Sequence, residues 1–451
     1  MSDVLKIRRG TDIKLQGEAE KILTDAPQAE SYAIKPTDFD GIKPKVVVKE
    51  GHEVKAGTVL MYDKNMEAVK FTSPVSGEVA KVKRGDKRKL LEIVILADKE
   101  IKYEDFGSAD PNSLGREEII KKMCDSGVWP FVRQRPYDVI ANPEDKPKSI
   151  FITAFDSAPL APDNDFIFHG QGALFQKGLD ALAKLTEGKV HLTVDGSAGV
   201  DEAFTQAKNV VLHKVSGPHP AGNVGVHIHN FDPIGAGETV WTLNAQDVLT
   251  IGRLFESGKF DATRIITICG SQIKDPKYYK TILGTNTKKL FQDLAKHDQE
   301  NRYISGNVLT GDKIDEDGYL GFYNYQLTAI PEGGEPRMFG WITPNPKKFS
   351  IHRSMVSWLQ PSKKYELNAE LNGEERPFVV TEEYEKVFPF DIYPVQLIKA
   401  IMVDDIELME ALGIYEVAPE DFALCEVVCT SKIPSQTIVR DGLNMLRKEM
   451  S

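Results

Sequence analysis

The sequence predicts a multi-domain protein that combines an α/β unit with small all-β units and ends in helices. Short apolar runs separated by Gly/Pro turns occupy residues 42–96, a pattern typical of a small all-β unit. Apolar strands alternate with helical patterns over residues 106–262, which favours an α/β layer with a mostly parallel sheet. At roughly 100–200 residues per domain, the 451 residues suggest two to four domains.

Composition and charge narrow the class of protein. Hydrophobic residues make up 41% of the chain and charged residues 27%, as in ordinary globular proteins rather than disordered or fibrous ones. The net charge is −11, so we expect no nucleic-acid partner, because such binders carry a basic stripe. The N-terminus has no apolar segment, and the longest stretch without a charged side chain, residues 215–231, is rich in Gly, Pro and His. We therefore expect no signal peptide, no transmembrane segment and a cytoplasmic location.

Residues 42–96 predict strands at 46–48, 59–61 and 90–96, with a turn at Ser73–Gly77. The basic run KVKRGDKRK spans Lys81–Lys89. It is either a solvated hairpin tip or a patch that meets an acidic partner or anionic lipid, and the sequence leaves both interpretations open.

The same stretch resembles the lipoyl/biotinyl-type hammerhead, a barrel-sandwich hybrid, in EGHEVKAGTVL and TSPVSGEVAKV. In that family a hairpin lysine carries the prosthetic group. Here Lys70 lies four residues before Pro74 and Lys64 lies ten residues before it. Neither lysine has the spacing of the family, so the resemblance implies a scaffold rather than a swinging arm.

Helical and strand patterns follow along the rest of the chain. A small β-grasp-like module fits the strand at 265–268, the helix that follows it and the turn at Gly311. The predicted strands are 149–154, 190–194 and 210–211, and the predicted helices are 117–124, 175–185, 246–255, 288–294, 395–402, 405–412 and 436–450.

No intact nucleotide motif is present. A dinucleotide fingerprint needs a third glycine three residues after the second. After Gly170-Gln171-Gly172, Phe175 occupies that position. After Gly235-Ala236-Gly237, Val240 occupies the position of the third glycine. Both pairs of glycines are interpreted as turns.

Histidines and cysteines form two further clusters. His227 and His229 would share one face if their segment were extended, but no nearby Cys or carboxylate completes a familiar metal site. The segment around His219, Ser216–Gly222, is predicted to be a structured loop that could line a partner or small-molecule surface. Cys425 and Cys429 lie four residues apart and would share one face of a helix; an iron–sulfur cluster needs more ligands than these.

Motifs spread over nearly the whole chain resemble the A-subunit family of the Na⁺-translocating NADH:quinone oxidoreductases. The motifs that carry the resemblance are IRRGTDIKLQG, SPVSGEVAKVKRGDKRK, GVWPFVRQRPY, LTEGKVHL, SGPHPAGNVGVHIHNFDP, WTLNAQDVLTIGRLFESG, RYISGNVLTG, MFGWI, EEYEKVFPFDIYP and DFALCEVVCTSK.

The resemblance implies four domains. They are a barrel-sandwich hybrid over 1–105 resembling the C-type component of the Rnf electron-transport complex, a Rossmann-like domain over 106–262, a β-grasp (SLBB-like) domain over 263–335, and a mixed, finally helical region over 336–451. The last three resemble the flavin- and NADH-binding subunit of respiratory complex I. The Gly-rich cofactor loop of that relative corresponds here to SGVWPFVRQRP, and its cluster motif is reduced to two cysteines. The redox fold is therefore expected to be kept and its cofactors lost.

By the same resemblance, the chain is a peripheral subunit on the cytoplasmic side of the bacterial inner membrane. Five other subunits, especially integral membrane ones, are the implied partners, and NADH, flavins, iron–sulfur and quinone act in or at those subunits. The complex couples NADH oxidation and quinone reduction to Na⁺ export. We expect this chain to dock on the membrane subunits and support quinone reduction, with no catalytic residue and no metal or cofactor of its own.

The alternative is that this subunit binds the quinone itself. A quinone site needs an apolar slot and one or two hydrogen-bond donors. Two segments offer that chemistry, one around Trp129 and the other between Gly217 and Trp241. The residues predicted to contact quinone or a partner are Trp129, Arg133, Arg135, His219, His227, His229 and Trp241.

Overall fold

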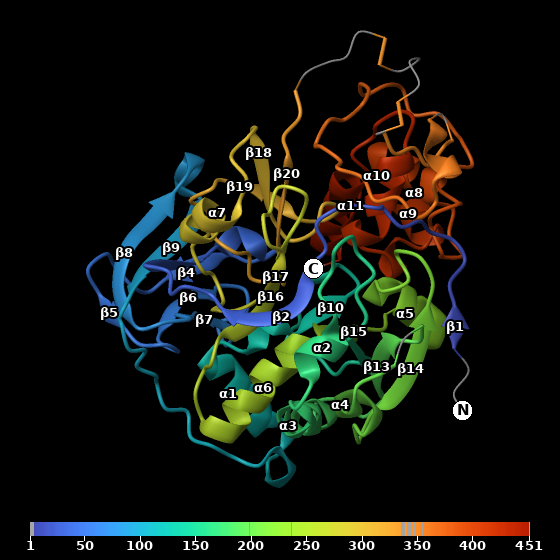
Figure 1. Cartoon of the computed structure of the whole chain (residues 1–451). Helices are drawn as coiled ribbons and strands as arrows, with labels where there is room; N and C mark the ends of the chain where they lie inside the picture. Colours follow the sequence, from blue (N-terminus) through green and yellow to red (C-terminus); the bar gives the residue numbers. More distant parts are fainter. Residues whose placement is uncertain are drawn as a thin grey trace.

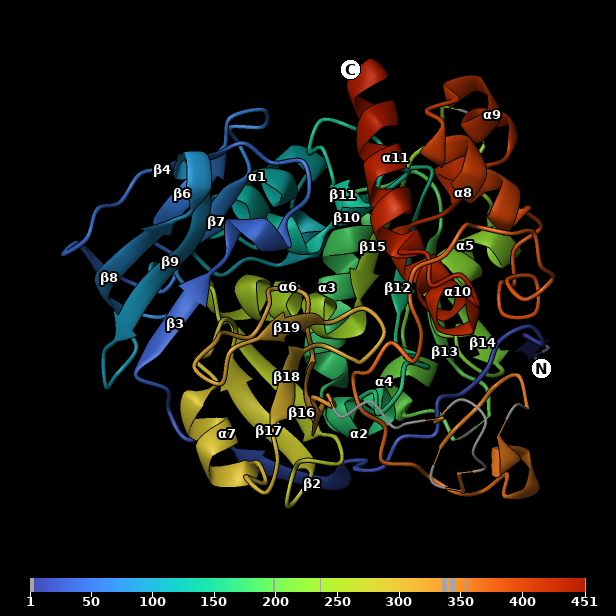
Figure 2. The same cartoon turned by 90° about the horizontal axis from the view of Figure 1, so that it is seen from above.

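The computed structural model describes residues 4–197, 199–235, 237–334, 339–340, 345–346, 348–353 and 355–450. The motif MFGWI at 338–342 lies outside the described residues, apart from Phe339 and Gly340. Within the described ranges, strands form sheets of seven, six, four and three strands. The small sheets and the C-terminal helices stand at opposite ends of the molecule (Figure 1, Figure 2).

The barrel-sandwich unit holds the two small sheets, which share one apolar core containing Leu60, Val79 and Ile93. Its predicted strands at 59–61 and 90–96 are confirmed, and Lys81–Lys89 lies at the end of the hairpin between the last two strands. In sheet order the strands are β3 (Ser31–Ile34), β9 (Leu90–Ala97), β8 (Gly77–Arg84) and β5 (Glu53–Val54), and then β4 (Pro44–Val46), β6 (Val59–Asp63) and β7 (Lys70–Thr72).

The α/β unit is built on the seven-stranded sheet. Ile150 and Ile152 of its central strand enter the core shared with α3 and α6, while Phe151 packs on the opposite face with Ile228 of α5. Near one edge, β10 pairs antiparallel with both β15 and β11, so β10 alone runs against the direction of the other strands. The strands in order are β1 (Leu5–Lys6), β14 (Val211–Ser216), β13 (Val190–Asp195), β12 (Ser149–Thr153), β15 (Val240–Asn244), β10 (Arg133–Arg135) and β11 (Val139–Ile140).

The three longest helices of the α/β unit, α1, α3 and α6, were predicted, whereas α2, α4 and α5 were not. Residues 224–231, for which no helix was predicted, form α5 (Val224–Phe231). The predicted strand at 210–211 is the start of a longer one, β14. The other helices are α1 (Arg116–Ser126), α2 (Asn164–Phe168), α3 (Gly172–Ala183), α4 (Glu202–Thr205) and α6 (Ala245–Ser257).

The β-grasp unit is built on the six-stranded sheet, with α7 (Lys288–Leu294) packed on it through Leu290 and Phe291. The predicted helix at 288–294 has these same bounds. The strands in order are β19 (Asp312–Ile314), β18 (Asn301–Ser305), β20 (Gln326–Pro331), β16 (Thr263–Cys269), β17 (Lys277–Ile282) and β2 (Glu20–Asp25).

The C-terminal unit is a helical cluster with its own core, which also takes in Val215 and Val226 of the α/β unit. The three predicted C-terminal helices are present. The helices are α8 (Pro394–Met402), α9 (Ile406–Ala411), α10 (Ala423–Val428) and α11 (Ser435–Glu449). Among the helices of the described residues, none has the length and apolar character needed to span a bilayer.

Residues 4–25 connect the other units rather than joining the barrel-sandwich sheets. β1 pairs in parallel with β14 of the α/β unit, and β2 pairs in parallel with β17 of the β-grasp unit. Between them, the Gly10 amide donates to the carbonyl of Lys386 (3.0 Å) and Leu15 bridges to Tyr365 in the C-terminal region. The N-terminal segment therefore ties three units together.

Candidate functional site

The segment 126–136, which corresponds by resemblance to a cofactor loop, is filled by its own side chains. Trp129 is fully buried and packs edge-on against Trp241, with 5.3 Å between the ring centroids. Its indole Nε1 donates to the carbonyl of Ala141 (2.8 Å). Phe131 stacks on Phe322 at 4.6 Å. Backbone amides can hold a phosphate only where it can approach them closely, and the two large rings of this segment are packed against other aromatic side chains of the chain.

The two arginines of the segment lie on β10 and share one face, because side chains alternate along a strand. The connection to β11 reverses the chain within three residues, and Tyr137 and Asp138 adopt positive φ values of 77° and 52°. The reversal places the Asp138 carboxylate 2.7 Å from Arg133 Nη2 and 3.5 Å from Arg135 Nε. An unfavourable turn conformation is thus accompanied by two ion pairs.

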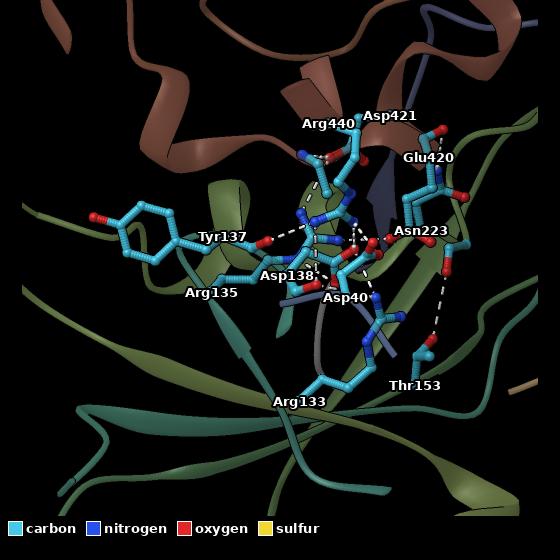
Figure 3. A network of polar contacts seen from close by, with 12 residues as sticks. Asp40, Arg133, Arg135, Tyr137, Asp138, Thr153, Asn223, Glu420, Asp421 and Arg440 are labelled. Atoms are coloured by element: carbon cyan, nitrogen blue, oxygen red, sulfur yellow. Dashed lines mark hydrogen bonds and ion pairs between the residues drawn. The ribbon is translucent and has the colours of Figure 1, made fainter. Parts of the chain in front are cut away.

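Carboxylates from the C-terminal unit complete the surroundings of Arg135, whose side chain is 1% exposed. Its guanidinium lies 2.7 Å from Glu420 Oε1 and 3.4 Å from Asp421 Oδ2. The side chain of Asn223, at the start of α5, donates to the carbonyl of Glu420 (3.4 Å). Arg135 therefore connects the sheet of the α/β unit to the residues just before α10 (Figure 3).

Arg440 of α11 reaches the same centre beside Asp421, and Arg133 lies at the other end of the network (Figure 3). Its Nη2 lies 3.0 Å from Asp138 Oδ2 and 3.3 Å from Asp40 Oδ2. Its Nη1 donates to the carbonyl of Tyr137 (2.8 Å). The ion network, defined as Asp40, Arg133, Arg135, Asp138, Glu420, Asp421 and Arg440, thus joins three units.

Burial and neighbouring charges set the protonation of the network. Burial by itself would raise the pKa of Asp138, but Arg133, Arg135 and Arg440 outweigh it and lower that pKa below the ordinary value. Burial raises the pKa of Asp421 well above its ordinary value, against the opposing effect of Arg135. Two carboxylates share one guanidinium there, so the second is harder to ionise.

A second buried ion group joins the α/β unit to the β-grasp unit. Arg264 Nη2, on β16, lies 3.9 Å from Asp247 Oδ1 on α6. The Arg264 guanidinium carbon lies 4.3 Å from the centre of the Tyr325 ring. The Tyr325 hydroxyl donates to the Asp247 carboxylate. Burial raises the pKa of Asp247 to about 6, although the charge of Arg264 opposes this rise. Like the ion network, this group holds two units in a fixed relation.

Two predicted histidines are buried in the α/β unit. His219 Nδ1 shares a hydrogen bond of 3.0 Å with Ser157 Oγ, and His227 Nε2 donates to the carbonyl of Ala221 (2.9 Å). Burial lowers the pKa of each histidine to about 4. Both are therefore neutral at physiological pH.

His227 and His229 do not share a face, which corrects the interpretation based on an extended segment. Both lie on α5, where positions two apart point in different directions. His227 faces the core, whereas His229 Nδ1 lies 3.1 Å from Glu416 of the C-terminal unit. The helix forms because Val226 and Ile228, on different sides of α5, are each buried in one of two adjoining cores.

The residues present do not fit an iron–sulfur cluster. Cys425 lies in α10 and Cys429 follows its last residue, and both thiols are buried. Burial raises the pKa of Cys425 well above its ordinary value, which disfavours the thiolate that binds iron. In the part of the chain that the structure describes, His, Cys, Asp and Glu form no group of three that could hold a metal ion.

The structure separates the seven predicted contact residues into three places. Trp129 and Trp241 contact each other, Arg133 and Arg135 share the ion network, and the histidines lie on and before α5. Sequence reasoning missed the other five members of the ion network, Asp40, Asp138, Glu420, Asp421 and Arg440. An acidic residue three positions after Arg135 was a weak signal for Asp138, but nothing local marked the distant partners.

Family models match most of the chain in the order of the units just described. The NqrA N-terminal barrel-sandwich hybrid domain matches residues 5–98, the NqrA second alpha/beta domain matches 114–260, and the NQRA C-terminal domain matches 265–316. A weaker likeness is to the crystal structure of an NAD⁺-reducing NiFe-hydrogenase in the air-oxidized state, at 9% identity and a TM-score of 0.34. It covers 48% of this chain and 47% of that one.

Similar proteins extend over the whole length. The A-subunit of the Na⁺-translocating NADH-quinone reductase of Neisseria meningitidis serogroup B is 38% identical over 450 residues, covering 99% of this chain and 100% of that protein. The corresponding A-subunits of Photorhabdus laumondii and Saccharophagus degradans are 37% and 38% identical, with the same coverage. From these matches and the order of its units, the chain belongs to the A-subunit (NqrA) family of the Na⁺-translocating NADH-quinone reductases.

Proposed function

We propose that this chain is a docking subunit of a Na⁺-translocating NADH-quinone reductase and carries no flavin or iron–sulfur cluster. It binds the membrane-embedded subunits from the cytoplasmic side and supports the quinone-reduction step. The relatives are subunits of an oxidoreductase complex by name, which supports the assignment to such a complex. The five partner subunits and the inner-membrane location are parts of the same proposal.

The filled segment 126–136 is the observation that carries this proposal. Trp129 and Phe131 are bulky, buried and packed against Trp241 and Phe322, and side chains of this size disfavour the close approach of a phosphate to the backbone. Arg135 is held by carboxylates of the chain itself, so its charge is not available to a phosphate. The segment that would bind a nucleotide instead fixes the C-terminal unit against the α/β unit.

Reconstitution of the complex with and without this chain tests the proposal. The remaining subunits are expected to lose quinone reduction and Na⁺ export, and the purified chain is expected to restore both when it is added back. A Lys146→Ala variant, which loses only an exposed ion pair with Glu187, is the matched control and should restore activity equally well. Assembly of the remaining subunits with unchanged quinone reduction and Na⁺ export would overturn the proposal.

A second candidate function is quinone binding by this subunit. Three of its predicted contact residues have a buried polar atom without a hydrogen-bond partner among the described residues, namely His219 Nε2, His227 Nδ1 and Trp241 Nε1. Buried polar atoms of this kind are uncommon and often mark a functional site. The Trp241 Nε1–H group is a donor that a quinone carbonyl could accept from.

Quinone kinetics of the reconstituted complex distinguish the two functions. His219→Ala is expected to raise the KM for quinone if this subunit binds it, and to leave KM unchanged if the subunit only docks. The matched control is His169→Ala, because the His169 side chain is 88% exposed. An unchanged KM in His219→Ala contradicts the second candidate.

A further inference from the structure

The end of the β8–β9 hairpin is strongly positive, whereas the chain as a whole is negative. We call residues Lys81–Lys89 the basic tip; six of its nine residues are Lys or Arg, and Asp86 is its one acidic member. The whole chain has a net charge of −11. Six like charges within nine residues repel one another. This cost suggests that the charges serve an external contact.

The hairpin extends beyond the core that anchors it. Gly77 and Val79 at the start of β8 are buried, whereas Lys81, Lys83 and Arg84 at its end are exposed. The hairpin lies at the periphery of the molecule, away from the C-terminal unit (Figure 1). A surface can therefore approach the basic tip without disturbing the ion network.

Most charges of the basic tip have no counter-charge within the protein. Lys83 Nζ lies 3.2 Å from Glu92, and Arg84 donates to the carbonyl of Arg88 (3.2 Å) rather than to a carboxylate. For Lys81, Lys87, Arg88 and Lys89, no carboxylate of the described residues lies within ion-pair distance. These cations are free to meet an anionic surface.

The backbone at the turn is also unusual. Lys87 and Arg88 have positive φ values of 52° and 62°, a conformation that Gly or Asn adopts at lower cost. Two basic side chains therefore occupy positions where the turn itself favours smaller residues. An external role for their charge accounts for this choice, whereas turn formation does not.

We propose that the basic tip docks on the anionic phospholipid headgroups of the membrane surface. A plane of headgroups is recognised by charge alone, and clusters of four to eight Lys/Arg are typical of such contacts. A protein partner instead needs an apolar centre to its interface. Val82 is the one large apolar side chain within the basic tip, and it is partly buried against the protein core. This contact is with lipid and does not depend on docking to other subunits.

Co-sedimentation of the full chain with lipid vesicles tests the proposal. The chain is expected to bind phosphatidylcholine vesicles that contain phosphatidylglycerol, and not to bind vesicles of phosphatidylcholine alone. High salt should release it, because screening shortens the range of the attraction to a few ångströms. A Lys87→Gln, Arg88→Gln, Lys89→Gln triple variant should bind roughly 100-fold more weakly, since each cation contributes severalfold.

The matched control removes three exposed lysines from the α/β unit, as Lys184→Gln, Lys189→Gln and Lys208→Gln. It has the same net charge as the tip variant and should bind vesicles nearly as well as the unmodified chain. Equal binding of both triple variants would overturn the proposal, because net charge rather than the basic tip would then govern binding.

Two further results decide between a lipid and a protein as the partner of the basic tip. Absence of binding to phosphatidylglycerol vesicles at low salt overturns the lipid proposal. If the tip variant then also fails to assemble with the other subunits in detergent, the basic tip binds an acidic protein instead. Normal assembly of the tip variant in detergent leaves the docking function intact, so failure of this inference is distinguishable from failure of the proposed function.

Discussion

Arg135 and Asp421 form a buried ion pair of 3.4 Å between residues 286 positions apart in the sequence. Their side chains are 1% and 0% exposed. Through this pair the edge of the seven-stranded sheet holds the C-terminal helices in place. Water cannot reach either side chain to replace a lost partner. A single substitution in this pair should therefore weaken the packing of the C-terminal helices on the seven-stranded sheet.

Arg135→Ala is expected to destabilise the protein strongly. It leaves Asp421 buried without its main counter-charge and removes one of the three arginines around Asp138. Removal of one partner of a buried ion pair costs about 3–5 kcal/mol. Urea unfolding followed by tryptophan fluorescence measures the loss. The control, Lys146→Ala, breaks a pair whose members are 69% and 89% exposed and should cost less than about 1 kcal/mol. Equal losses for both variants would contradict this account.

Gly225→Ala tests the close approach of α5 to the C-terminal unit. A Cβ at this position would lie 2.7 Å from Asp421 Oδ2, and the carboxylate cannot withdraw while Arg135 holds it. Overpacking of this kind typically costs about 1–3 kcal/mol. Gly199→Ala is the control, because a Cβ there has no neighbour within 4 Å. Thermal unfolding that is unchanged in Gly225→Ala would show that the contact is not tight.

His219 is expected to contribute to acid unfolding. Burial lowers its pKa from 6.5 to about 4, so the unfolded chain binds a proton at a higher pH than the folded chain does. The stabilisation from neutral His219 is therefore complete above pH 6.5 and is lost as the pH falls towards 4.

His219→Gln should make the fall in the free energy of unfolding over this pH range shallower, by up to roughly 3 kcal/mol. Urea unfolding at a series of pH values measures the slope. The exposed His169, changed to Gln in the same way, is the control. An identical slope in His219→Gln and in the unmodified protein would mean that burial of His219 does not govern acid stability.

Trp129→Ala is expected to cost about 3–5 kcal/mol, because a fully buried aromatic side chain leaves a cavity when it is truncated. The loss includes the hydrogen bond to Ala141 and the packing against Trp241. Differential scanning calorimetry measures the change. Trp358→Ala, at a position 56% exposed, should stay within about 0.5 kcal/mol. A small effect at Trp129 would show that the segment 126–136 is loosely packed.

Elements with strong local patterns were predictable from the sequence. α7 has the predicted bounds, and α6 and α11 differ from the prediction by one or two residues at each end. α5 was not predicted, because Val and Ile at alternate positions resemble a strand and the helix is fixed by burial between two cores. β2 escaped prediction because its six residues are exposed and its pairing with β17 is long-range.

The candidate site was predictable only in part. Trp129, Arg133 and Arg135 stood out because they replace glycines expected from the resemblance, and the structure brings both arginines into one network. Their partners Glu420 and Asp421 could not be inferred, since a pair of adjacent carboxylates is common in any sequence. Which distant charges meet is decided by the packing of whole units, and no local pattern encodes that.

The visible absorption spectrum of the purified, full-length chain tests the central claim most directly. A subunit that supports quinone reduction by docking, without transferring electrons, is expected to show no flavin or iron–sulfur absorption. A flavin band would mean that the segment 126–136 opens to admit a cofactor despite Trp129 and Phe131. A cluster band would mean that Cys425 and Cys429 find further ligands. Either band would contradict the account, because electrons could then pass through this subunit.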